Sequence, residues 1–79
     1  MEKFLITLSS PIAVRTQNGV KMVNAVEANM QRLNAQEIIL TVGRYFDSQN
    51  ENMWDVTPAA KVIVKSSNIR SKQQIGRTA

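Results

Sequence analysis

The order of hydrophobic and polar residues predicts a strand at the start of the chain. Residues 4–8 (Phe-Leu-Ile-Thr-Leu) are a β-prone run, and Ser-Ser-Pro at 9–11 is a turn signal. We therefore expect a strand over 3–8. Residues 12–16 alternate only in part, so they form either a second strand or a loop.

The Asn18-Gly19 pair allows two interpretations of what comes next. Asn-Gly is a strong hairpin signal, because both residue types tolerate positive φ. In the first interpretation, strand 12–16 turns at this pair into a strand that begins at Val20. In the second, the pair ends a loop and a helix begins.

The following segment favours a helix. Val23, Val26, Met30 and Leu33 are spaced by three, four and three residues, which would place them on one helical face. Several alanines raise the helix propensity, and Asn, Gln and Arg side chains lie between the apolar ones. We predict a helix over about 21–34, with this stripe in the core.

Residues 37–46 fit two structures. Asn34 followed by Glu37 could be a capping box that opens a second helix over 36–48. The β-branched residues of this segment and Gly43 disfavour a helix interior. We favour a buried strand and keep the second helix as the main rival.

The second half of the chain continues with short strands. Residues 53–56 could pair with 38–46 as a hairpin with a long turn, and Thr57-Pro58 should end that strand. Residues 61–65 read as a short strand with a lysine at each end, which is typical of a protected edge. From residue 66 onward apolar residues become rare, so 66–79 is expected to be a flexible basic tail.

These elements predict an α+β fold. A small antiparallel sheet of three to five strands would pack against one main helix at about 21–34. The stripe from Val23 to Leu33 would lie against Ile6, Ile39 and Ile63. We expect one small domain over 1–65 followed by the tail at 66–79.

Composition excludes several classes of enzyme. The chain of 79 residues has no cysteine and no histidine. It therefore has no disulfide framework, thiolate nucleophile, Cys-type zinc site or Ser-His-Asp triad. Its few acidic residues form no recognisable catalytic or metal-binding pattern, and its three glycines form no phosphate-binding loop. We expect a protein that is not an enzyme and has no cofactor.

The positive charge is concentrated at the end of the chain. Residues 1–60 contain five basic and six acidic residues, whereas residues 61–79 contain five basic residues and no acidic one. Such asymmetry is typical of segments that bind polyanions, although it is also typical of a tail that only aids solubility.

The leading functional hypothesis is a small nucleic-acid-binding protein that acts mainly through phosphate contacts, with single- or double-stranded targets left open. Tyr45 and Trp54 could stack on bases, or they could simply belong to the core. The basic residues expected to contact phosphates are Lys61, Lys65, Arg70, Lys72 and Arg77, with Arg44 added if its strand lies alongside.

The second hypothesis is a small protein-protein interaction module. It could be an inhibitor, an adaptor or an assembly subunit of the kind that viral or plasmid genes encode. In that case the tail would dock onto an acidic protein partner. Under either hypothesis a homodimer would help to stabilise so small a domain. Deleting 66–79 would separate the two hypotheses. It should nearly abolish nucleic-acid binding but spare a protein contact made by the folded face. No targeting or membrane segment is visible in the sequence, so a cytoplasmic location is expected.

Overall fold

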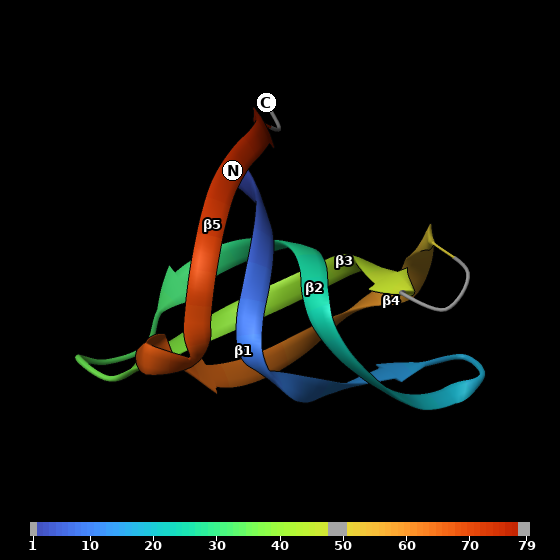
Figure 1. The fold of residues 1–79 in the computed structure, drawn as a ribbon, viewed down its shortest axis with the longest axis horizontal. Helices are drawn as coiled ribbons and strands as arrows, with labels where there is room; N and C mark the ends of the chain where they lie inside the picture. Colours follow the sequence, from blue (N-terminus) through green and yellow to red (C-terminus); the bar gives the residue numbers. More distant parts are fainter. Residues whose placement is uncertain (1, 48–50, 78–79) are drawn as a thin grey trace.

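The protein folds as a five-stranded antiparallel sheet (Figure 1). The computed structural model describes residues 2–47 and 51–77, except for the side chain of Arg77. A single turn of 3-10 helix, η1, precedes the last strand. The elements are β1 (Glu2–Thr16), β2 (Gly19–Arg32), β3 (Glu37–Asp47), β4 (Asn52–Lys65), η1 (Ser66–Asn68) and β5 (Ile69–Arg77).

Strand β1 organises the sheet, because its first half pairs on both sides. The strand order is β4-β3-β2-β1-β5, so β1 lies between β2 and β5. The ladder with β5 runs from Glu2 to Leu8 and stops there. The ladder with β2 continues to Thr16, with a register shift between Thr7 and Ile12. Three extra residues of β1 are accommodated at this shift, which bends the strand.

The predicted α+β class and the main helix over 21–34 are wrong, because this segment is strand β2. Val26, Ala28 and Met30 point inward at the spacing of two residues that a strand requires. Val23 is also buried, opposite Ile12, although it lies three residues before Val26. The register shift at the bend in β1 therefore sets these buried positions of β2 three residues apart, and not two. That spacing is the one expected on one face of a helix.

The sheet curls around its own hydrophobic core. Figure 1 shows β1 and β5 crossing the layer of β3 and β4 at a steep angle. Of the residues expected beneath a helix, Ile6 is fully buried, but Ile39 is only half-buried and Ile63 is exposed on the outer surface. The buried residues come from four strands: Ile6, Leu8, Val14, Val23, Val26, Ala28, Ile38, Leu40, Val42, Tyr45, Val56 and Val64.

The hairpin interpretation of Asn18-Gly19 is confirmed. Thr16 pairs with Gly19 across a two-residue loop. Thr16 Oγ1 donates a hydrogen bond to the carbonyl of Gly19 (2.8 Å) and accepts one from the N–H of Asn18 (3.1 Å). Only Gly19 has positive φ in this turn, at 111°. Glycine is therefore required at position 19, whereas Asn18 adopts an ordinary backbone conformation.

Asn34 caps a turn and not a second helix. Its Oδ1 accepts hydrogen bonds from the N–H groups of Gln36 (2.8 Å) and Glu37 (2.9 Å). Its Nδ2 donates to Glu37 Oε1 (2.9 Å). Only one contact of a capping box is thus present, the hydrogen bond from the Glu37 N–H to Asn34 Oδ1, and the chain continues as β3. The preference for a strand over 37–46 is confirmed, and the rival helix over 36–48 is wrong.

The hairpin of β3 and β4 is confirmed, but Thr57-Pro58 does not end β4. The two predicted strands at 53–56 and 61–65 are parts of one strand. Val42 pairs with Ala60 while Arg44 pairs with Asp55, so residues 56–59 bulge opposite Gly43. A proline at a bulge of an edge strand removes no ladder hydrogen bond, which explains why β4 tolerates it.

The prediction of a flexible tail is wrong for residues 66–77. Residues 66–68 form η1 and residues 69–77 form β5, whereas 78–79 lie outside the described residues. The side chains of β5 are mostly exposed, so the strand is held mainly by its backbone ladder with β1. Because that ladder covers the strand that carries Ile6 and Leu8, β5 is part of the folded unit.

Replacing Gly19 with alanine should destabilise the protein, whereas the same change at Gly43 should not. Gly43 lacks positive φ, and neither position has a heavy atom within 4 Å of an added Cβ. We expect Gly19→Ala to lower the free energy of unfolding by about 1–2 kcal/mol through backbone strain alone. Gly43→Ala should change it by less than about 1 kcal/mol. Urea unfolding measures both; equal losses would contradict this account of the turn.

Deleting residues 66–79 should unfold the protein. The truncation removes η1 and β5 and leaves the outer edge of β1 unpaired. Domains of this size have a free energy of unfolding of only about 5 kcal/mol. Losing the contacts of an entire strand costs more than this. Circular dichroism and urea unfolding should therefore show an unfolded or molten chain. A double variant, Arg70→Gln with Lys72→Gln, removes charge without removing the ladder and should unfold like the wild type. A stable, cooperative truncated protein would contradict this prediction.

Candidate nucleic-acid interface

Two unpaired strand edges face each other in the curled sheet. Beyond Leu8, the side of β1 that points away from β2 has no strand partner among the described residues. Strand β4 is the end of the sheet and pairs only with β3. Although β1 and β4 are not hydrogen-bonded neighbours, some of their Cα atoms approach within 8 Å. We call the space between these edges the seam groove.

The seam groove contains two hollows along the β1–β4 boundary. The first, of about 480 Å³, is lined by Ser9, Ser10 and Ile12 of β1 and by Ile63, Val64 and Lys65 of β4, together with Ser67 and Asn68. The second, of about 410 Å³, is lined by residues 15–17 on one side and 57–61 on the other. From the first hollow to the second, residue numbers rise along β1 and fall along β4. The two edges therefore run antiparallel.

The charge of the seam groove is entirely positive. Arg15 comes from β1, and Lys61 and Lys65 come from β4. No acidic residue lines either hollow in the described part of the chain. The other polar lining groups are hydroxyls and amides, which can donate hydrogen bonds to an anion. The groove therefore offers positive charge and neutral donors along the same line.

One end of the seam groove is fixed by Asn68 of η1. Its Oδ1 accepts a hydrogen bond from the N–H of Ser10 (2.8 Å), and its Nδ2 donates to the Ser10 carbonyl (3.2 Å). This amide pairs with β1 just beyond the last rung with β5, Leu8 with Ile69. Asn68 thus makes the two hydrogen bonds that a residue of a neighbouring strand would make. The unpaired edge of β1 begins after Ser10.

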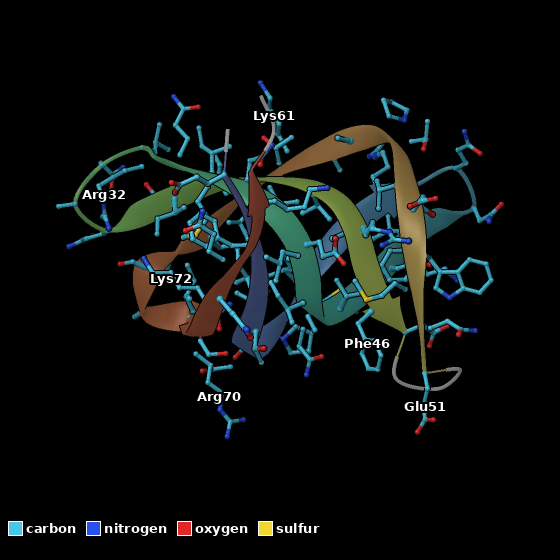
Figure 2. All side chains as sticks on the ribbon, turned by 90° about the horizontal axis from the view of Figure 1, so that it is seen from above. Arg32, Phe46, Glu51, Lys61, Arg70 and Lys72 are labelled. Atoms are coloured by element: carbon cyan, nitrogen blue, oxygen red, sulfur yellow. The ribbon has the colours of Figure 1, made fainter. Side chains whose placement is uncertain are left out.

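The structure brings only part of the predicted basic set together. Lys61 and Lys65 lie on β4 in the seam groove, and Arg70 and Lys72 lie exposed on β5. Figure 2 shows Lys61 and Arg70 pointing toward opposite edges of the molecule. Arg77 is the last residue of β5, opposite Glu2, and its side chain lies outside the described residues. The predicted cations therefore do not form one patch.

Arg44 lies apart from these cations and is already paired. Its Nε donates to Asp55 Oδ1 at 3.0 Å, and its guanidinium lies 3.7 Å from Glu27. These contacts form on the outer face of β2, β3 and β4, beside a smaller hollow of about 290 Å³ over Gly43. A phosphate at Arg44 would have to compete with two carboxylates, which makes this side chain a weak anion site.

The two predicted stacking residues occupy different environments. Tyr45 and Trp54 are opposite each other on β3 and β4. Tyr45 is 9% exposed and belongs to the core, so it is not available to stack on a base. Trp54 is 47% exposed. It lines neither hollow of the seam groove, so stacking there would extend any interface beyond the groove.

Arg15 is the one basic residue lining the two hollows, among the described residues, that the sequence did not single out. It lies in the half of the chain without excess positive charge, so charge distribution alone gave no reason to choose it. Its position matters because β1 bends toward β4 and places Arg15 in the same hollow as Lys61. The partial alternation of residues 12–16 indicated a strand. Nothing in the sequence indicated that this strand approaches β4.

Two further features of the described residues concern other kinds of site. They contain no group of three or more Asp or Glu side chains arranged to hold a metal ion. Within the same part of the chain, no helix has the length and apolar character needed to cross a membrane.

Comparison with known proteins identifies no relative. The chain matches no protein-family model, no curated protein and no solved structure. The interpretation of the seam groove therefore rests on its own geometry and charge.

Truncating the two opposed aromatic residues should have unequal effects on stability. Tyr45→Ala removes a buried ring and should lower the free energy of unfolding by about 3 kcal/mol. Trp54→Ala removes a half-exposed ring and should lower it by about 1 kcal/mol. Urea unfolding followed by far-UV circular dichroism measures both variants in the same way. Similar losses would show that Trp54 is as important to the core as Tyr45.

Proposed function

We propose that this protein binds nucleic acid through phosphate contacts in the seam groove. The observation that carries the proposal is the placement of Arg15, Lys61 and Lys65 around one groove, with no acidic lining residue among those described. Polyanionic phosphate backbones are the ligands that such a groove favours, because each neutralised phosphate releases counterions.

Neutral donors in the groove support the same ligand. Half or more of the hydrogen bonds between proteins and DNA go to phosphate and sugar, and many come from hydroxyl, amide and backbone N–H groups. The groove supplies such side chains from Ser9, Ser10, Thr57 and Ser67. Since these contacts carry no direct sequence information, the proposed binding has little sequence preference.

The cations of β5 have a secondary place in this proposal. Arg70 and Lys72 are exposed and follow η1, which borders the groove. They add favourable long-range potential, but they do not line either hollow. The groove cations are therefore expected to dominate binding.

The alternative function is a protein-protein interaction module, and exposed apolar residues favour it. Val20 and Met22 of β2 are 58% and 65% exposed. Neighbouring exposed apolar side chains are common in interaction surfaces. A partner that binds there would contact the β1–β2 hairpin and would not depend on Lys61 or Lys65.

Two charge-matched double variants test the proposed function. One replaces Lys61 and Lys65 with glutamine, and the other replaces Arg70 and Lys72 with glutamine. Fluorescence anisotropy of labelled single-stranded DNA, single-stranded RNA and duplex DNA is measured over a range of salt concentrations. We expect the groove variant to weaken binding about tenfold or more and to reduce the log–log salt slope by about 1.4 for single strands. The β5 variant should have a smaller effect.

Other outcomes would reject the proposal. Absence of binding to every oligonucleotide at low salt would exclude nucleic-acid binding and favour the interaction module. Binding that depends on the β5 pair and not on the groove pair would place the interface on β5 instead of the seam groove. Urea unfolding of both variants serves as the control, because all four side chains are exposed and should leave stability unchanged.

A further inference from the structure

The shape of the seam groove distinguishes between kinds of nucleic acid. We infer that the groove binds one strand of nucleic acid lengthwise and excludes a duplex. This inference rests on the proposed function and specifies its ligand. Three observations carry it: the distance between the walls, the distribution of charge on both walls, and the alignment of the two hollows.

The walls of the groove are close together. Cα atoms of β1 and β4 approach within 8 Å, which is less than the roughly 10 Å that an additional strand between them would need. Neither a peptide strand nor a sugar–phosphate chain therefore passes between the two backbones, and a bound chain lies in the two hollows beside them. A duplex is a stiff rod with a persistence length of about 150 base pairs, so it cannot rearrange its phosphates to enter the two hollows, whereas a flexible single strand can.

The cations lie on both walls, so only a ligand within the groove contacts all of them. Lys61 and Lys65 are four residues apart on β4, which is about 13 Å in an extended strand. Arg15 lies across from Lys61 on β1 and lines the same hollow. A duplex resting on the outside of β4 would contact the lysines and miss Arg15. Arg15 is therefore the residue that should separate the two ligands.

The hollows form one path along the groove. The part of β4 from Thr57 to Lys65 borders both of them, and its regular segment from Ala60 to Lys65 spans about 17 Å at the rise of a strand. This length accommodates several linked nucleotides. No aromatic side chain lines either hollow in the described part of the chain, so bases are not held by stacking there. The groove thus holds the sugar–phosphate chain and does not recognise the identity of the bases.

A steric variant tests whether the ligand lies inside the groove. Ala59 is exposed and lines the hollow that contains Arg15 and Lys61, so Ala59→Trp fills this hollow. Ala35 is also exposed but lies in the connection between β2 and β3, so Ala35→Trp is the matched control. Each variant is titrated with a single-stranded oligonucleotide and with a hairpin duplex of the same sequence, at low salt.

The inference predicts a specific pattern of affinities. The single strand should bind the wild type at least about tenfold more tightly than the duplex does. Ala59→Trp should weaken the single strand about tenfold and leave the residual duplex binding unchanged, and Ala35→Trp should change neither. Arg15→Gln provides a second test that adds no bulk, and it should weaken the single strand more than the duplex.

The failures of the inference and of the proposed function are distinguishable. If duplex binds as tightly as the single strand, or if Ala59→Trp and Arg15→Gln affect both ligands equally, the inference is overturned while nucleic-acid binding stands. If neither oligonucleotide binds the wild type, the proposed function fails and the inference fails with it. Thermal unfolding by circular dichroism confirms that each variant is folded before the titration.

Discussion

The whole architecture depends on the backbone hydrogen bonds of β1. Its first half is paired on both sides, with β2 and with β5, while its second half pairs with β2 alone. The change occurs where the register shifts between Thr7 and Ile12. This bend turns the second half of β1 toward β4, buries Val14 completely and leaves one edge unpaired. The core and the seam groove therefore have the same origin.

In the proposed function, the lysines of β4 have two physical roles. Lysine on an edge strand opposes pairing with further copies of the same chain, because the charges would have to approach each other. Lys61 and Lys65 are exposed on such an edge. The same charges attract a polyanion, whose own backbone forms no β-ladder. Under the proposed function, such an edge attracts phosphates while its charges oppose pairing with other strands.

The sequence allowed most of the strands and an antiparallel sheet to be predicted, but not β2 and β5. Apolar and polar residues alternate regularly from Val26 to Gln31, yet the alanines and the spacing from Val23 favoured a helix. Strand β5 could not be predicted from hydrophobicity, because a polar edge strand is held by backbone hydrogen bonds. Charge clustering pointed to the lysines of the candidate site. Arg15 required knowledge of how β1 bends, which no local pattern specifies.

The pairing of β1 with β5 also determines the order in which the sheet can form. The β1–β2, β2–β3 and β3–β4 pairs are hairpins between neighbours in the chain, whereas Lys3 pairs with Gly76. Closing such a long loop costs more entropy than closing a hairpin, so contacts of this range slow folding. β5 is also the last of the described strands to be synthesised. Until β5 is synthesised, β1 keeps its outer edge open to other chains.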